Sequence, residues 1–173
     1  MLVLQHVMRI YFLGISSITM ITIAIIIIIN IIITNSPTCG NPSGQVTSLV
    51  NYLSSNCKSY WSGRIWLDIE GSQYWLGSSS SNQAFYKSLK DACSSHARCG
   101  IYSSYYQWED IFGSTSFVYG NDLPLWYAHY DGNPSFSDFS AFGGWSKPFI
   151  KQYNGDLTKC STSVDVNYSP YSV

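Results

Sequence analysis

The sequence contains few charged residues. Asp, Glu, Lys and Arg together make up 11% of the 173 residues, and the formal net charge is −1. Proteins that bind nucleic acid usually present a basic surface to the phosphates, and this composition offers no such surface. We therefore expect no nucleic-acid partner.

The chain is also short for one common α/β architecture. A complete (β/α)8 barrel typically takes about 250 residues, and at least roughly 200, whereas this chain has 173. The length is still sufficient for one domain with a proper hydrophobic core. Any barrel formed by this chain must therefore be incomplete.

A long run near the N-terminus lacks charge altogether. Residues 10–33, IYFLGISSITMITIAIIIIINIII, span 24 residues without a charged side chain, and a helix across a bilayer core needs about 20. No clear small-residue cleavage site follows the run. We therefore expect residues 1–35 to form an uncleaved signal anchor or transmembrane helix, with residues 10–33 in the membrane. A misassigned start of the reading frame is the alternative.

The orientation of this segment follows from its flanks. Arg9 is the only cation before the run, and the next is Lys58. The positive-inside rule then places the N-terminus in the cytoplasm. Residues 36–173 are expected to form the folded domain in an extracellular or lumenal space, such as a lysosome, a phagosome or the secretory pathway. Cleavage of the N-terminus would instead give a secreted protein.

Five cysteines are consistent with that compartment, because an oxidising environment favours disulfides. Cys93 and Cys99 are close enough in sequence to link a helix end to the next strand. The same stretch, CSSHARC, also resembles a metal site through His96, but no second ligand cluster accompanies it and structural zinc takes four ligands. We expect neither a metal nor another cofactor. The odd number of cysteines leaves one unpaired.

The order of helical and strand patterns predicts the fold class. Apolar residues recur at helical spacing over residues 44–55 and again after Asn82, which is a candidate N-cap. Strand patterns alternate with them, and the last three follow without a long helix between them. This alternation predicts an α/β fold, an incomplete TIM-like barrel of about five strands from residue 39 onward. The five strand patterns are RIWLDIE, GIYSS, LWYAHY, FIKQY and SVDVNY.

Two acids stand at the end of the first of these strands. Successive side chains in a strand point to opposite faces, so Trp66, Asp68 and Glu70 share one face. A solvent-exposed edge of the sheet would be a sufficient explanation for one acid. Two acids beside a Trp are typical of a sugar-cleaving site, where one carboxylic acid protonates the leaving oxygen and a second group stabilises positive charge at the anomeric carbon.

Other strands bring further candidates toward the same place. Asp165 arrives from the last strand, as expected for an active site built from strand ends, although a turn or edge position would also explain it. Aromatic and amide side chains on the same faces are candidates for substrate binding, and plain core packing is the alternative for each aromatic ring. These candidates are Tyr102, Trp126, Tyr130, Gln152 and Asn167.

The ordered set IWLDIEG, GIYSS, LPLWYAHYD, IKQYNG and VDVNY resembles the glycoside hydrolase family 25 lysozymes, which are N-acetylmuramidases acting on bacterial peptidoglycan. The resemblance covers roughly residues 39–170. It implies that Glu70 is the general acid, that Asp68 steers or stabilises the reacting sugar, and that Asp165 belongs to the catalytic cleft. It also implies that Tyr102, Trp126 and Gln152 line that cleft.

The departure from this family is equally specific. Its barrel begins with further strands, the first of which carries another acid, and the sequence before Thr38 holds no such segment. We therefore expect a lysozyme-like domain truncated at its N-terminus. Its expected function is cleavage of the β-1,4 bond between N-acetylmuramic acid and N-acetylglucosamine, for bacterial digestion or defence. An inactive peptidoglycan-binding relative and a truncated gene product are the alternatives.

Overall fold

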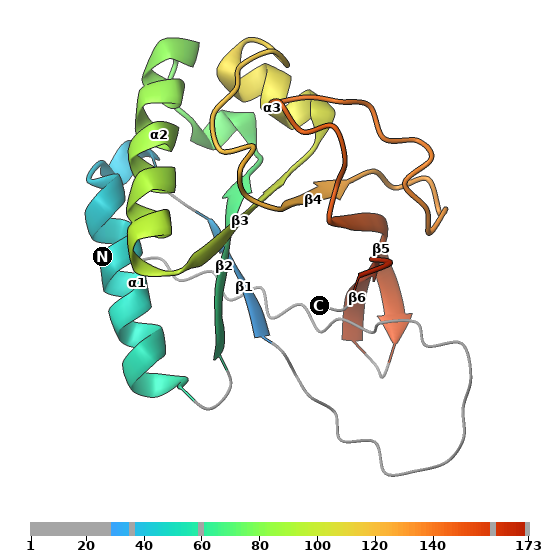
Figure 1. The fold of residues 1–173 in the computed structure, drawn as a ribbon, viewed down its shortest axis with the longest axis horizontal. Coiled ribbons are helices and arrows are strands. Elements are labelled where there is room, and N and C mark those ends of the chain that lie inside the picture. The colour runs from blue at the N-terminus through green and yellow to red at the C-terminus, as the bar shows by residue number, and fades with distance from the viewer. Residues whose placement is uncertain (1–28, 35–36, 59–60, 160–161, 172–173) are drawn as a thin grey trace.

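The computed structural model describes residues 29–34, 37–58, 61–159 and 162–171. They form one six-stranded sheet with helices packed against it (Figure 1). The strands follow one another in chain order, β1 to β6. The first four pairings are parallel and the last, between β5 and β6, is antiparallel. The bounds of the strands are Ile29–Thr34 (β1), Trp61–Ile69 (β2), Arg98–Ser103 (β3), Leu125–Ala128 (β4), Ile150–Lys159 (β5) and Thr162–Tyr168 (β6).

The predicted transmembrane helix is wrong. Residues 29–33, the end of the predicted span, lie in β1, which pairs in parallel with β2. Within the described ranges, no helix combines the length and the apolar character needed to cross a bilayer. Residues 10–28 lie outside these ranges. The physical reason for the error is that Ile and Thr favour strands, and a strand in a parallel sheet often reads as an unbroken apolar run.

β1 also corrects the expectation that no strand precedes Thr38. Its residues Ile31–Thr34 pair in register with Ile65–Asp68 of β2, so β2 is an inner strand of the sheet. The sequence of β1, INIIIT, carries no acid. The five strands predicted from residue 39 onward are present as β2 to β6.

The helices begin and end where local chemistry directs them. α1 (Pro42–Asn56) starts with Asn41, whose Oδ1 accepts a hydrogen bond from Gly44 N, followed by Pro at the first helical position. α2 (Ser79–His96) is capped by Ser78, so the prediction of Asn82 as the cap is wrong. Asn82 is buried instead, where it bonds Leu76 N and Ile111 O. α3 (Tyr105–Phe112) is the third helix, and single 3-10 turns lie at Pro37–Cys39 (η1) and Ser72–Tyr74 (η2).

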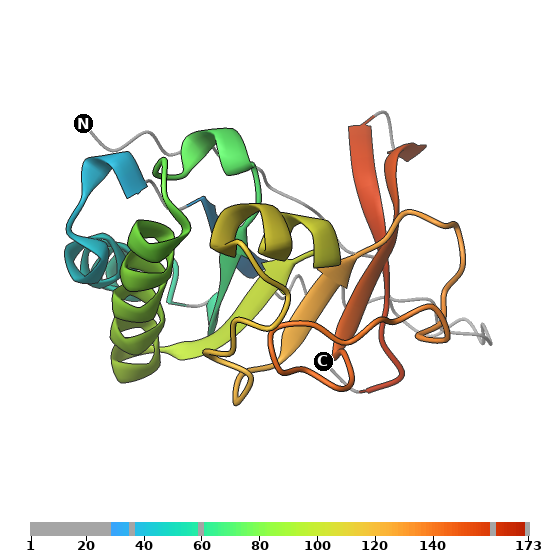
Figure 2. The same ribbon diagram turned by 90° about the horizontal axis from the view of Figure 1, so that it is seen from above.

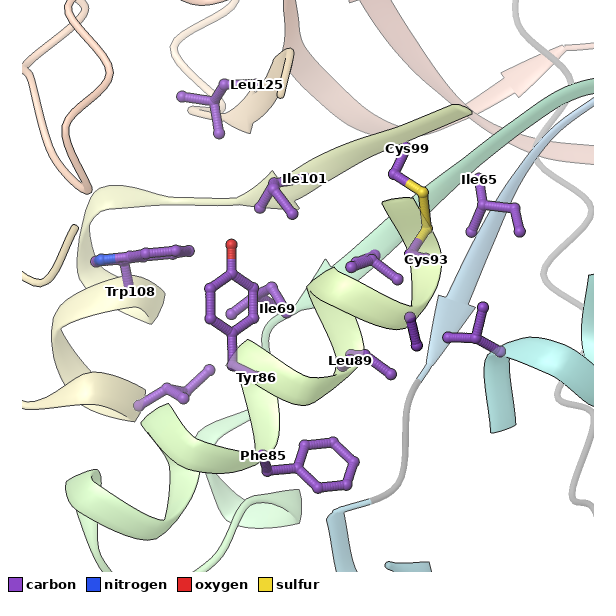
Figure 3. Packing of buried hydrophobic residues seen from close by; sticks show 14 of the residues in the cluster. Ile65, Ile69, Phe85, Tyr86, Leu89, Cys93, Cys99, Ile101, Trp108 and Leu125 are labelled. Carbon is purple, nitrogen blue, oxygen red and sulfur yellow. A yellow bond between two sulfur atoms is a disulfide. The ribbon is translucent and has the colours of Figure 1, made fainter. Parts of the chain in front are cut away.

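The helices cover one face of the sheet, which we call the outer face. α1 and α2 lie side by side along it, and α3 lies at the carboxyl ends of the strands (Figures 1 and 2). Ile69 and Ile101 lie near Tyr86 of α2 and Trp108 of α3, whereas Ile65 lies toward the Cys93 end of α2 (Figure 3). This packing removes the apolar face of each element from water, which is the main stabilising contribution to the fold.

The inner face carries a second, smaller cluster. Trp66, Tyr102, Trp126 and Ile150 come from four successive strands and are each at most 5% exposed. Three of them are aromatic, and the Trp126 ring makes edge-to-face contacts with both Trp66 and Tyr102, at centroid distances of 5.4 and 5.2 Å. β2 and β3 therefore present aliphatic side chains such as Ile65 and Ile101 to the helices and the aromatic rings of Trp66 and Tyr102 to the inner face.

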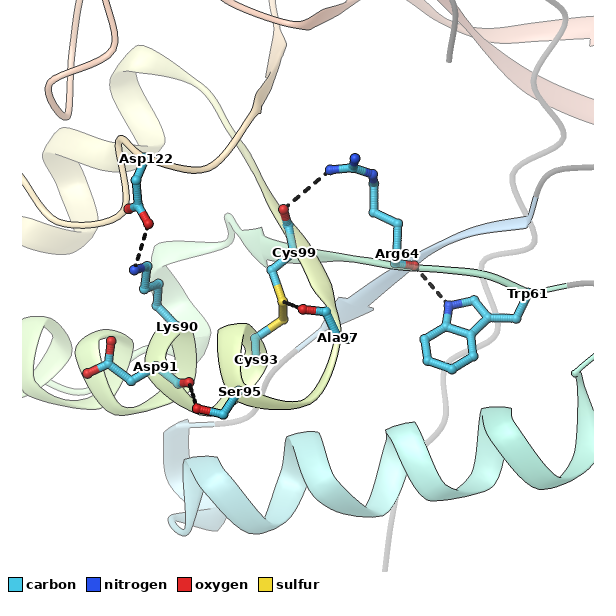
Figure 4. Close-up of a disulfide and its surroundings, with 9 residues drawn as sticks. All are labelled: Trp61, Arg64, Lys90, Asp91, Cys93, Ser95, Ala97, Cys99 and Asp122. Atoms are coloured by element: carbon cyan, nitrogen blue, oxygen red, sulfur yellow. Dashed lines mark hydrogen bonds and ion pairs between the residues drawn. A yellow bond between two sulfur atoms is a disulfide. The ribbon is translucent and has the colours of Figure 1, made fainter.

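The predicted link between Cys93 and Cys99 is present as a disulfide, and it ties the last turn of α2 to the start of β3 (Figure 4). Cys39 and Cys57 are free thiols at opposite ends of α1. A helix of 15 residues is about 22 Å long, and a disulfide requires Cα atoms within about 7 Å. Cys39 and Cys57 therefore cannot pair with each other in this fold, and Cys160 lies outside the described residues.

Candidate active site

Asp68 and Glu70 occupy the carboxyl end of β2. Asp68 is 8% exposed and lies on the inner face, in register with Tyr102 of β3. Glu70 follows directly after the strand and is exposed. Because the two residues are separated by two positions along an extended chain, their Cα atoms are about 7 Å apart on one face. One acid is thus buried within the sheet and the other stands at its rim, in water.

The backbone around Glu70 is held on both sides. The Glu70 carbonyl accepts a hydrogen bond of 3.1 Å from Trp75 Nε1, and Gly71 N donates one of 2.8 Å to Gln107 Oε1 of α3. Gly71 has φ 67°, a left-handed conformation that residues with a side chain rarely adopt. The turn therefore ends the strand sharply and fixes the position from which the Glu70 side chain extends.

Gln152 is the centre of a hydrogen-bond network on the inner face. Its Oε1 accepts hydrogen bonds of 2.6 Å from the hydroxyls of both Tyr102 and Tyr130. Its Nε2 donates to Asp165 Oδ2 at 3.0 Å, and Asp165 Oδ1 accepts from Asp156 N. Gln152 is fully buried, so each of these bonds forms away from bulk water. Side chains from β3, β5, β6 and the loop after β4 are thereby joined.

Trp126 and Asn167 form a second pair beside this network. Trp126 Nε1 donates to Asn167 Oδ1 at 2.9 Å, and both side chains are buried. This bond orients the Asn167 amide, and its Nδ2 has no hydrogen-bond partner among the described residues. A buried donor without a partner carries an energetic cost, which a ligand oxygen would relieve.

The structure thus brings the sequence-predicted residues to one end of one face. Tyr102, Tyr130, Gln152 and Asp165 are joined directly by hydrogen bonds, and Trp126 is joined to Asn167. Asp68 adjoins them through its register with Tyr102. Glu70 follows directly after β2 and stands exposed at the rim of the same end. Trp126 is 1% exposed, so its ring contributes to positioning the amide of Asn167 more than to an open surface.

A second polar cluster was missed by the sequence analysis. Lys151 is fully buried on the outer face of β5, and its ammonium binds Asp131 Oδ2 at 2.8 Å and Asp138 Oδ1 at 2.6 Å. Asp138 also accepts from the Tyr127 hydroxyl and pairs with His129 Nδ1. The available signal was Lys151 itself, because a lysine between Ile150 and Gln152 in a buried strand requires charged partners.

The ion pairs of this cluster shift the acidity of its members. Burial by itself would raise the pKa of Asp138, but hydrogen bonds from Lys151, His129 and Tyr127 outweigh it and lower the pKa to about 2. The hydrogen bond from Lys151 also lowers the pKa of Asp131. Burial raises the pKa of Tyr127, and the hydrogen bond to Asp138 is the second largest cause of this rise. The cluster is therefore ionised at the acids and neutral at the phenol over the physiological range.

The same cluster has the donor set of a cation site. Potential ligand atoms of His129, Asp131 and Asp138 all lie within 4.8 Å of one another. However, both carboxylates already bind the ammonium of Lys151, which supplies the positive charge that a metal would bring. The arrangement is better explained as an ion-pair cluster around the buried Lys151 than as a metal centre.

Comparison with known proteins gives the family. The family model described as lysozyme-like protein 1 matches residues 14–153. Probable GH family 25 lysozyme 2 of Dictyostelium discoideum is 50% identical over 135 residues. The chain belongs to the glycoside hydrolase family 25 of lysozyme-like proteins. The resemblance inferred from the five ordered motifs is confirmed.

Two further proteins are similar to this chain at lower identity. Lysozyme-like protein 5 of Caenorhabditis elegans is 36% identical over 135 residues, which is 77% of this chain. Among solved structures, the Clostridium perfringens spore cortex lytic enzyme SleM matches with a TM-score of 0.60 at 21% identity. That match covers 76% of this chain and 45% of SleM, and it supports the fold alone.

The family 25 relatives are longer than the matched region. The alignment with the Dictyostelium lysozyme covers 78% of this chain and 61% of that protein, and the alignment with the Caenorhabditis protein likewise covers 61% of its length. The chain therefore spans about three fifths of the length of each of these two relatives.

Proposed function

We propose that this chain hydrolyses the β-1,4 glycosidic bond between N-acetylmuramic acid and N-acetylglucosamine in bacterial peptidoglycan. The observation that carries the proposal is the position of Asp68 and Glu70, one buried and one exposed, at the end of a strand whose inner face leads into the Gln152 network. Family membership and peptidoglycan as the family's substrate support it. Digestion of bacteria or defence against them is the corresponding biological role.

In the proposed reaction Glu70 acts as the general acid. Its exposed side chain is accessible to a polymer, and it donates a proton to the glycosidic oxygen as the bond to the anomeric carbon breaks. The oxygen of the 2-acetamido group, on the sugar that contains this anomeric carbon, attacks the carbon from the side opposite the breaking bond. Asp68, two positions earlier on the same face, holds the amide N–H and balances its developing positive charge. Water then opens the cyclic intermediate and returns a proton to Glu70.

The Gln152 network supports this chemistry from the side. Asp165 is held through both of its oxygens, by Gln152 Nε2 and Asp156 N, so its carboxylate has a fixed direction. We assign it to the cleft as a group that orients the substrate or the attacking group. Asn167 Nδ2 supplies a donor for a sugar oxygen. A direct attack by a carboxylate on the anomeric carbon is the alternative route.

The compartment is part of the same proposal. The disulfide between Cys93 and Cys99 favours an oxidising space, and peptidoglycan is met outside the cytosol or in the lumen of an organelle. We therefore place the folded domain in an extracellular or lumenal compartment.

The test is clearing of a bacterial cell-wall suspension by the full chain. The full chain is required because β1 belongs to the sheet, and a protein that starts at Ser36 would lose it. Glu70→Gln is compared with Glu109→Gln, which changes the other glutamate of the sequence, an exposed residue on α3. Circular dichroism checks that both variants fold.

The expected result is clearing that Glu70→Gln reduces by about 100- to 10,000-fold, the usual contribution of a general acid, and that Glu109→Gln leaves unchanged. Mass analysis should find N-acetylmuramic acid at the new reducing ends. A folded chain that binds the cell wall without clearing it would instead indicate a peptidoglycan-binding relative. Equal clearing by both variants would reject Glu70 as the acid.

A further inference from the structure

A cleft of about 340 Å³ lies between α3 and the loop that follows β4. Aromatic rings form much of its wall, and Tyr106 at the start of α3 is 73% exposed. Its polar groups come from Ser104, His129, Asp138 and Ser140, and from the hydroxyls of the tyrosines. Ligand sites are typically concave and of about 300–1,000 Å³, with a few polar groups that fix orientation. The cleft lies at the lower end of this size range and combines aromatic rings with polar groups.

The cleft lies beside the candidate active site, at the carboxyl ends of β3 and β4. Ala128, the last residue of β4, lines the cleft and also pairs in register with Gln152, the centre of the inner-face network. Ser104 lies directly after Ser103, which pairs with Ile69 at the end of β2. The cleft and Glu70 therefore lie at the same edge of the sheet, where the parallel strands end.

The wall formed by the loop is held in place before any ligand arrives. Asp138 is bound by Lys151, Tyr127 and His129, and Lys151 itself is fully buried on β5. His129 N and Gly132 N further donate to backbone carbonyls of β5. A preformed wall loses little conformational freedom on binding, which favours affinity for a flexible polymer.

The chemistry of the wall selects the ligand class. An exposed tyrosine ring offers a flat apolar surface with a polar edge, suited to the face of a sugar ring. The side chain of His129 is 56% exposed. Its Nδ1 is engaged by Asp138, so Nε2 is the ring nitrogen that can hydrogen-bond a polar group of a ligand. An N-acetylated sugar presents an apolar ring face, an amide N–H and hydroxyls together.

We propose that this cleft is a further sugar-binding subsite, which takes an N-acetylated sugar of the same glycan strand beyond the sugars at Glu70. The inference rests on the proposed function, because the strand must cross the active site to reach Ala128. Tyr106 provides the stacking surface, and His129 together with Ser104 provides the polar contacts. The subsite makes binding stronger for longer glycans than for short ones.

The experiment measures binding without cleavage, in the full chain carrying Glu70→Gln. The probes are peptide-free glycan oligomers of alternating N-acetylglucosamine and N-acetylmuramic acid, as a disaccharide and as a hexasaccharide, followed by tryptophan fluorescence or calorimetry. Tyr106→Ala is added to this background. Tyr52→Ala is the matched control, because Tyr52 is 52% exposed on α1 and does not line the cleft.

The hexasaccharide should bind more tightly than the disaccharide, and Tyr106→Ala should weaken hexasaccharide binding by about tenfold with little effect on the disaccharide. Tyr52→Ala should change neither. An unchanged length dependence in Tyr106→Ala would overturn the subsite while leaving the proposed function standing. Binding that strengthens only when stem peptides are attached would also overturn it. Failure of both oligomers to bind would remove the proposed function together with the subsite.

Discussion

The two faces of the sheet use the same strands for different purposes. On the outer face, Leu67, Ile101 and Leu125 are aliphatic, at most 1% exposed, and packed against the helices. On the inner face, their neighbours Tyr102 and Trp126 are equally buried, but each carries a polar atom that makes a hydrogen bond. Burial alone therefore does not distinguish a structural side chain from a functional one.

This contrast predicts how the two faces respond to substitution. Truncating an outer-face side chain removes packing, so stability should fall while the geometry of the inner face survives. Removing a polar tip on the inner face changes little volume, so activity should fall more than stability. Lys151 is the exception, since it places a charge on the outer face directly beside Gln152.

Lys151→Met should give the largest loss of stability. It leaves Asp131 and Asp138 without their buried cation, and breaking a buried ion pair in this way costs about 3–5 kcal/mol. Urea unfolding at pH 7 measures the change. Lys147→Met is the control, because Lys147 is exposed. Equal stability of the two variants would show that the cluster contributes nothing to the fold.

Leu67→Ala tests the outer face itself. Leu67 is fully buried in the helix-packed core, and truncating a leucine there costs about 2–5 kcal/mol. Cell-wall clearing per folded molecule should stay near the original level at a temperature where the variant is folded. Leu157→Ala, at a half-buried position on β5, should cost less. A proportionate loss of clearing in Leu67→Ala would mean that the two faces are not separable.

The sequence predicted some regions of this molecule better than others. Alternation along β2 sorted Leu67 from Asp68 correctly, because a strand has only two faces. The Ile-rich run of β1 was misread, since its period does not distinguish a strand in a parallel sheet from a membrane helix. The ordered motifs anticipated the residues of the Gln152 network, but no local pattern links Lys151 to Asp131 and Asp138, which meet only through the path of the loop after β4.

Asp138→Asn should remove an acid-dependent part of the stability. The pKa of Asp138 falls from 3.8 in the unfolded chain to about 2 in the fold. A lowered folded-state pKa means stability that is present above pH 4 and lost as the pH falls toward 2. The difference in unfolding free energy between the original chain and Asp138→Asn should therefore shrink by about 2 kcal/mol between pH 5 and pH 2.

The control for this pH series is Asp122→Asn. Asp122 pairs with Lys90 at 3.1 Å, but its side chain is 64% exposed, so water and salt screen the interaction. The difference in unfolding free energy between the original chain and Asp122→Asn should stay nearly constant over the same pH range. A constant difference for Asp138→Asn as well would mean that Lys151 does not hold the carboxylate in its ionised form.

Tyr130→Phe should give the smallest change in stability and the sharpest test of the inner face. Tyr130 is 58% exposed, and its hydroxyl donates to Gln152 Oε1 at 2.6 Å. Loss of that bond costs about 0.5–1.5 kcal/mol at most, since Tyr102 still donates to the same oxygen. Clearing should nevertheless fall several-fold, because the Gln152 amide that holds Asp165 is less firmly oriented. The control, Tyr52→Phe, should change neither stability nor clearing. If Tyr130→Phe also left both unchanged, the network would position nothing that the reaction uses.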